Sequence, residues 1–202
     1  MHIIALVVFL FKLIAANYSP DYKEELSLYR RLADHEVVPN MFNITEGYTT
    51  EWLNVSYPGI DIQGSYVKLD WIKNEPLKVE WSRCKKDKYY TLMLADIDYV
   101  PYRFSNDKHW YAWFIGNIPG PICNITEGDL IFPYLIKGPE HGIDSHRYFY
   151  FVWEQYIYDE EFKNPKRFNP NTKRTYLEVN LWAEIFNMDG PVAANYFVLH
   201  YD

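Results

Sequence analysis

Two aspartates, Asp96 and Asp98, come directly after a short apolar run at residues 90–95. A second apolar run, at residues 111–115, follows the polar loop that these aspartates open. Carboxylates that leave the end of a buried strand are typical of a site carried by a rigid scaffold. Asp also starts ordinary solvent-exposed turns, and on this stretch alone a turn is the more frequent explanation.

A metal site is one chemistry that paired carboxylates support, but hard cations need several oxygen ligands. Only Glu140 and Asp144 are candidates to join the two aspartates. Three histidines, His109, His141 and His146, lie near the same loops without the spacing of a zinc site. The ligand count is too small for a cation, so we expect no metal ion.

Asp144, Ser145 and His146 have the residue types of a Ser-His-Asp catalytic triad and are consecutive in the sequence. Adjacent residues on a strand point to opposite faces, so these three side chains do not converge as a triad requires. The sequence has no Gly-x-Ser-x-Gly elbow, Walker loop or dinucleotide fingerprint. We therefore expect a protein that is not an enzyme and that needs no cofactor.

Short strands in one domain are predicted to position these residues. Aromatic residues make up 19% of the 202 residues, and aromatic content favours strands. Apolar or alternating runs predict strands at residues 53–57, 66–71, 77–81, 90–95, 111–115, 130–136, 147–156 and 194–201. The run at 147–156 is apolar on both faces, which predicts a central strand that is covered on both sides.

Two helices are predicted to accompany the strands. A Ser-Pro start, with serine as the cap and proline at the first helical position, predicts a helix over residues 19–35. A second helix is predicted over residues 175–188, where Leu181 and Ile185 recur four residues apart. The following Gly190-Pro191 is typical of the end of a helix.

The N-terminal residues 1–16 are apolar, have the length of a signal-peptide core and end in small residues. Lys12 interrupts this segment, and a membrane anchor is the alternative, although about 20 residues are needed to span a bilayer. We expect a signal peptide at 1–16, a domain at 17–202, and a secreted, extracellular protein without stable membrane insertion.

Secretion predicts further features that the sequence contains. Asn43, Asn54 and Asn124 begin Asn-x-Ser/Thr triplets, which are acceptors for N-glycosylation. The two cysteines, Cys84 and Cys123, are either a disulfide or two inert thiols. The net charge of −7 and the lack of a Lys/Arg-rich block disfavour nucleic acid as a partner.

Three blocks of the sequence resemble motifs of the phosphatidylethanolamine-binding protein family. The segment YYTLMLADIDYVP resembles the family's Y-T-L-x-x-x-D-P-D-A-P motif. HWYAWFIGN resembles its E-W-H-H strand, and GPEHGIDSHRYFYFVWEQ resembles its G-P-P-x-G-x-x-H-R-Y block. The resemblance covers roughly residues 37–202. It implies a mainly-β, antiparallel β-sandwich with a short N-terminal helix, one C-terminal helix and a small anion pocket at one end.

The resemblance also implies which residues form the ligand pocket: Asp96, Asp98, Trp110, Pro139, His146 and Tyr148. The chemistry suits an anion, because a histidine donates hydrogen bonds to an anionic oxygen and a nearby carboxylate orients the ring. A tryptophan supplies an apolar floor with a polar edge. Asp96 and His146 are thus expected to lie together.

Several positions depart from the family pattern. The second pocket histidine falls at Ala112, the second proline of the pair at Glu140, and Tyr99 replaces a small residue. Losing one charge-assisted hydrogen bond costs roughly 1.5–3 kcal/mol, and a nearby carboxylate adds repulsion. Both a retained anion site and a repurposed pocket therefore remain open.

Two functions follow from the resemblance. The first is a secreted, non-enzymatic binding protein whose pocket takes a small anion, a phospholipid headgroup or another small hydrophobic ligand. The alternative is an extracellular interaction or regulatory protein, for example a protease inhibitor, with a degenerate pocket. Its partner is then an extracellular protein.

Overall fold

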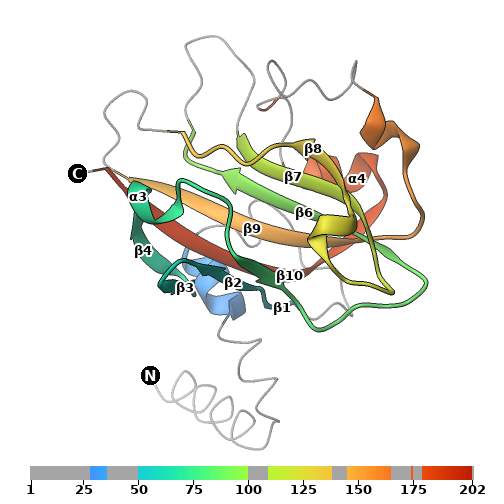
Figure 1. Ribbon diagram of the computed structural model, residues 1–202, viewed down its shortest axis with the longest axis horizontal. Coiled ribbons are helices and arrows are strands. Elements are labelled where there is room, and N and C mark those ends of the chain that lie inside the picture. The colour runs from blue at the N-terminus through green and yellow to red at the C-terminus, as the bar shows by residue number, and fades with distance from the viewer. Residues whose placement is uncertain are drawn as a thin grey trace, which may run out of the picture.

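The computed structural model describes residues 28–35, 50–99, 109–137, 145–164, 174 and 179–201. Within this part of the chain, a seven-stranded main sheet packs against a three-stranded small sheet (Figure 1). The main sheet contains β1 (Glu51–Trp52), β4 (Ser65–Lys68), β6 (Tyr89–Asp96), β7 (Trp110–Pro119), β8 (Asp129–Phe132), β9 (Ser145–Gln155) and β10 (Met188–His200). The small sheet contains β2 (Asn54–Tyr57), β3 (Ile60–Ile62) and β5 (Lys78–Glu80).

Within the same ranges, the helical elements are a helix over residues 28–34, α3 (Leu69–Ile72), α4 (Val179–Ile185), and the 3₁₀ turns η1 (Ile125–Glu127) and η2 (Glu160–Lys163). The main sheet has the order β1-β10-β9-β6-β7-β8, and β4 also pairs with β10. β1 and β4 run parallel to β10, whereas the other neighbours are antiparallel. The predicted mainly-β sandwich is confirmed.

Strand β9 is the centre of the molecule, because it lies between β10 and β6 and is covered on both faces. Tyr148 and Tyr150 belong to the core between the two sheets. Phe149 and Phe151 belong to a second core, which includes Leu28 of the helix over residues 28–34 and residues of α4. Successive residues of a strand point to opposite faces of the sheet. A strand that is apolar on both faces must therefore be packed against other elements on both sides.

The C-terminal helix ends earlier than the sequence predicts and buries a different face. α4 ends at Ile185, and residues 175–178 lie outside the described ranges. Leu181 and Ile185 are exposed, whereas Trp182 is buried against aromatic rings of β7. Burial of the large indole decides the orientation, because it removes more apolar surface from water than a leucine does.

Two predicted boundaries are wrong, because strand pairing sets the observed ones. β4 pairs with β10, and β10 pairs with β9. The predicted strand at 66–71 ends at Lys68, and α3 begins with the next residue. The segment Gly190-Pro191, which was expected to end a helix, lies inside β10. Gly190 has φ 127°, a left-handed conformation that glycine adopts readily, and the pairing of β10 with β9 is irregular there.

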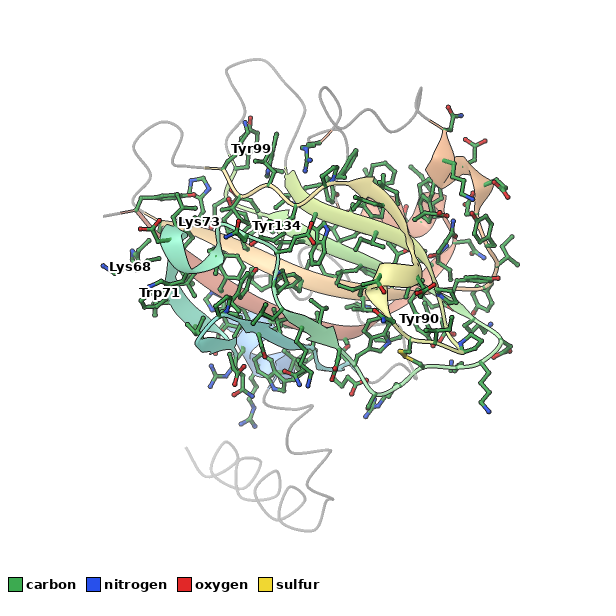
Figure 2. The ribbon with its side chains drawn as sticks, viewed as in Figure 1. Lys68, Trp71, Lys73, Tyr90, Tyr99 and Tyr134 are labelled. Carbon is green, nitrogen blue, oxygen red and sulfur yellow. A yellow bond between two sulfur atoms is a disulfide. The ribbon has the colours of Figure 1, made fainter. Side chains whose placement is uncertain are left out.

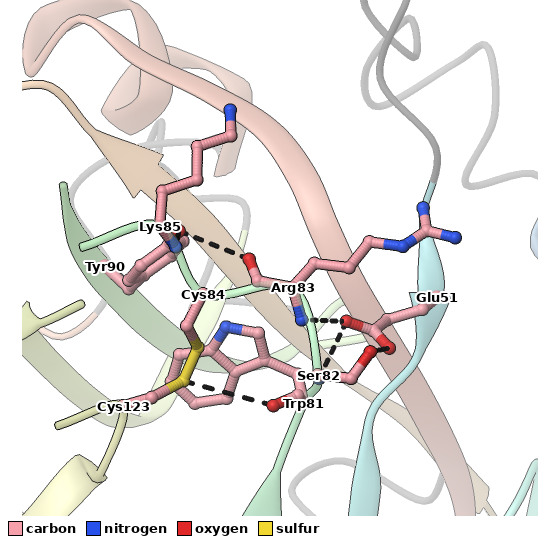
Figure 3. Close-up of a disulfide and its surroundings, with 8 residues drawn as sticks. All are labelled: Glu51, Trp81, Ser82, Arg83, Cys84, Lys85, Tyr90 and Cys123. Atoms are coloured by element: carbon pink, nitrogen blue, oxygen red, sulfur yellow. Dashed lines mark hydrogen bonds between the residues drawn. A yellow bond between two sulfur atoms is a disulfide. The ribbon is translucent and has the colours of Figure 1, made fainter. Parts of the chain in front are cut away.

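A disulfide joins Cys84, before β6, to Cys123, after β7 (Figure 3). Their Cα atoms are 6.1 Å apart, which is within the usual range for a disulfide. Ser82 and the backbone N–H of Arg83, on the loop that carries Cys84, donate hydrogen bonds to the carboxylate of Glu51 in β1. Of the two alternatives for the cysteines, the disulfide is confirmed.

Candidate functional site

A buried imidazole–carboxylate pair joins the ends of two neighbouring strands. Asp96 is the last residue of β6, and His146 is the second residue of β9. The distance between His146 Nδ1 and Asp96 Oδ2 is 2.6 Å, and the two residues are 2% and 1% exposed. The carboxylate fixes the orientation of the ring, and a protonated imidazole has a donor on each nitrogen for an anionic oxygen.

The loop that follows β6 returns at once to β9. The backbone N–H of Asp98 donates to the Asp96 carboxylate at 3.0 Å, which is the pattern of an Asx turn. The N–H of Ile97 donates to the carbonyl of Arg147 at 3.1 Å. Asp96 therefore both starts a turn and contacts His146. The turn and the site, which the sequence alone leaves as alternatives, occur together.

Burial is the main influence on the Asp96 carboxyl and raises its pKa above the ordinary value. The hydrogen bond from His146 and the charge of the imidazolium act in the opposite direction without cancelling this effect. A buried carboxyl with a raised pKa next to an imidazole is an arrangement that can hold a proton close to a ligand.

Two tyrosine hydroxyls lie beside the pair. Tyr148 is the register partner of Asp96 and is fully buried, and burial followed by the nearby Asp96 raises its pKa well above the ordinary value. Its hydroxyl donates to the Lys137 carbonyl at 3.5 Å, and the Tyr201 hydroxyl donates to the same carbonyl at 2.9 Å. The Tyr201 ring meets the His146 ring edge-on at 5.5 Å. Tyr148 is thus a neutral phenol.

Trp110 forms the outer wall of the site. It is the register partner of Asp96 on β7, and its indole N–H donates to the Leu135 carbonyl at 3.3 Å. Its ring lies 5.7 Å from the ring of Tyr99, which belongs to the loop after β6 and is labelled in Figure 2. The Lys137 ammonium lies 4.0 Å from the centre of the Trp110 ring. The tryptophan is therefore covered by an aromatic ring and by a cation.

Ala112, at the position that lacks the family's second histidine, is fully buried. Its carbonyl accepts hydrogen bonds from the Leu135 N–H at 2.7 Å and from Arg174 Nη1 at 3.3 Å. The guanidinium of Arg174 also lies 5.5 Å from the Trp110 ring. Burial lowers the pKa of Arg174 to about 10, so it remains a cation at neutral pH.

Asp98 lies away from His146 and pairs with Arg147. The Asp98 carboxylate accepts hydrogen bonds from Arg147 Nε at 2.8 Å, from Nη2 at 2.6 Å and from the backbone N–H at 2.9 Å. Burial favours a higher pKa for Asp98, but the hydrogen bonds from Arg147 outweigh it, and the pKa is lowered. Because adjacent residues of a strand face opposite ways, Arg147 draws Asp98 away from the His146 face of β9.

A hollow of about 550 Å³ lies on the Arg147 side of β9. The residues that line it are His35, Tyr66, Asp98, Ser145, Arg147, Val198 and His200. Tyr66 and His200 stack on each other with their ring centres 5.1 Å apart. Ser145 thus lies with Arg147 rather than with His146, as the alternation of the strand predicts, and these neighbours do not form a nucleophile–base pair.

Of the predicted pocket residues, Asp96, Trp110, His146 and Tyr148 are brought together. Pro139 lies outside the described residues, as do Glu140, Asp144 and His141. Among the residues that the structure does describe, no group of three or more metal-ligating side chains is present. No helix in the same ranges has the length and apolar character needed to cross a bilayer.

The residues that sequence reasoning missed are Lys137, Arg174 and Tyr201. Lys137 and Arg174 reach Trp110, and Tyr201 reaches His146. None of the three belongs to a quoted motif, so the motifs gave no signal for them. The pairing of β9 with β10, which sets Leu199 opposite His146, is the feature that brings Tyr201 to the site.

The architecture and the site together define a β-sandwich protein with a buried histidine–aspartate pair at one end of its main sheet. The model of the phosphatidylethanolamine-binding protein family matches residues 43–197, and the chain belongs to this family. The resemblance that the three motifs suggest is thereby confirmed.

Solved structures support the same fold. The phosphatidylethanolamine-binding protein from Plasmodium vivax has a TM-score of 0.67 and 16% identity, covering 86% of this chain and 97% of that one. The protein from Plasmodium falciparum has a TM-score of 0.62 and 18% identity, with coverages of 85% and 96%. A carboxypeptidase Y inhibitor, solved in complex with its cognate proteinase, has a TM-score of 0.64 and 16% identity, with coverages of 91% and 98%.

Proposed function

We propose that this chain is a secreted, non-enzymatic binding protein that takes a small phosphate-type oxyanion, free or as a phospholipid headgroup. The single observation that carries the proposal is the buried pair of His146 and Asp96, whose nitrogen and oxygen are 2.6 Å apart. Burying such a pair is costly unless it is used or strongly compensated, and perturbed ionisable groups gather at functional sites. Trp110 and Tyr148, the two register partners of Asp96, give this pair aromatic neighbours.

The proposal predicts that the purified protein binds inorganic phosphate and phosphoethanolamine, as measured by calorimetry. His146→Gln is expected to weaken both at least about tenfold, because one charge-assisted hydrogen bond is lost. The matched control is His200→Gln, an exposed histidine that lines the hollow on the other face. Loss of binding in His200→Gln alone would place the ligand in that hollow, and no heat with the unaltered protein would refute the proposal.

A second candidate function is favoured by the covered tryptophan. Tyr99 and Lys137 lie over Trp110, and Ala112 offers no side-chain donor. A covered pocket wall with one donor fewer fits a protein that acts through its surface. The carboxypeptidase Y inhibitor that shares the fold binds its cognate proteinase. Inhibition of a serine carboxypeptidase by the unaltered protein, retained in His146→Gln and without phosphate binding, would select this function over the first.

Three features support the proposal that the protein is secreted: the sequence of residues 1–16, two exposed acceptor asparagines and the disulfide. Disulfides persist in oxidising compartments. Asn54 and Asn124 are exposed, and the Asn124 side chain accepts a hydrogen bond from the N–H of Thr126 at 3.1 Å. Asn43 lies outside the described residues.

Secretion predicts N-glycosylation when eukaryotic cells express the full chain. The protein recovered from the medium is expected to lose mass on treatment with an N-glycosidase. Asn124→Gln should remove the mass of one glycan. Asn195 is unsuitable as a control position, because it is buried and its amide is hydrogen-bonded. Asn187→Gln, outside any acceptor triplet, is the matched control. Retention of the chain inside the cells without glycans would contradict the proposal.

A further inference from the structure

The side chain of Lys137 is held in a defined place at the edge of the site. Its ammonium lies 4.0 Å from the centre of the Trp110 ring and 5.1 Å from the centre of the Tyr99 ring. The two rings are 5.7 Å apart and inclined at 40°. A cation is attracted to the faces of aromatic rings, so a side chain that is ordinarily flexible has a preferred position here.

The backbone of Lys137 is held as well. Its carbonyl accepts hydrogen bonds from the hydroxyls of Tyr201 and Tyr148. These two tyrosines also flank His146, since Tyr201 meets its ring and Tyr148 lies two residues further along the same face of β9. Both ends of Lys137 are therefore tied to residues that surround the histidine–aspartate pair.

The charges near this lysine favour an anion. Asp96 is paired with His146, and the second carboxylate, Asp98, is paired with Arg147 on the opposite face of β9. Arg174 adds a further cation at the same tryptophan. A strongly hydrated ammonium on a flexible stem is a usual partner for phosphate oxygens.

We infer that Lys137 contacts the bound oxyanion and supplies positive charge to a site in which the buried Ala112 offers no side-chain donor. The inference rests on the proposed function, because it names a further binding residue of the same site. Tyr99 then has a role of its own, since together with Trp110 it holds the Lys137 ammonium in place.

The test compares Lys137→Gln and Lys137→Arg with the unaltered protein by calorimetry. Inorganic phosphate and phosphoethanolamine are titrated separately, which distinguishes a free anion from a headgroup. Lys137→Gln is expected to weaken both about tenfold, and Lys137→Arg is expected to restore most of the affinity because the charge returns. Lys73→Gln makes the same charge change at an exposed lysine, whose ion partner Asp70 is 3.5 Å away, and should leave binding unchanged.

Each other outcome overturns the inference in a different way. Unchanged phosphate affinity in Lys137→Gln, with normal binding by the unaltered protein, removes the lysine from the site and leaves the proposed function intact. Tighter binding of phosphocholine by Lys137→Gln would mean that the ammonium occupies the place of a ligand cation. No binding by the unaltered protein refutes the proposed function and the inference together. Circular dichroism and a urea melt of each variant exclude misfolding as the cause.

Discussion

Replacing Asp98 by alanine is expected to lower the free energy of unfolding by about 3 kcal/mol. The change removes three hydrogen bonds to Arg147 and leaves a guanidinium that is only 30% exposed without its carboxylate. Urea denaturation followed by tryptophan fluorescence measures the effect. The matched control is Asp70→Ala, because Asp70 also pairs with a basic side chain but is 90% exposed, and such pairs contribute little.

The same pair predicts a pH dependence with a definite sign. Burial acts to raise the pKa of Asp98, but the hydrogen bonds from Arg147 prevail and lower it below the unfolded value of about 3.9. A carboxyl with a depressed folded pKa stabilises the protein above the unfolded pKa, and this stability is lost as the pH falls through the folded pKa. The difference between the unaltered protein and Asp98→Ala should therefore shrink below about pH 4. A difference that stays constant down to pH 2 would contradict the pairing.

Removing the disulfide is expected to destabilise the protein by about 4 kcal/mol, since the bond closes a loop in the unfolded chain. Cys84 and Cys123 are 39 residues apart in sequence, and this separation sets the entropy that the crosslink removes. The double variant Cys84→Ala, Cys123→Ala is compared with the unaltered protein in urea, with and without a reductant. Reductant should shift the midpoint of the unaltered protein alone. Coincident curves for both proteins would show that the crosslink does not contribute.

The sequence was informative where burial dominates. The run at 147–156 lacks polar alternation, and β9 is covered on both faces as that pattern predicts. Only the family resemblance predicts that Asp96 and His146 lie together, since they are 50 positions apart in sequence and no local pattern links them. Asp98 looks equivalent to Asp96 in the sequence, yet the alternation of β9 gives it Arg147 as its partner, on the face opposite to His146.

Other features could not be predicted because they depend on packing between distant segments. Leu181 and Ile185 have the spacing of a buried face, but the single indole of Trp182 prevails over both. Gly190-Pro191 has the composition of a helix end, and only pairing with β9 places it inside a strand. The position of Lys137 depends on three side chains that come from β7, from the loop after β6 and from the chain end after β10.

The paired aspartates also restrict how far this region can move. Asp96, at the end of β6, holds His146, and Asp98, in the loop that follows, holds Arg147. Two consecutive residues of the central strand are thus fixed, one on each face. The imidazole cannot turn without disturbing a carboxylate that the same loop backbone already engages. Such preorganisation reduces the entropy lost on binding, so a small ligand with few contacts is better served by this frame than by a mobile loop.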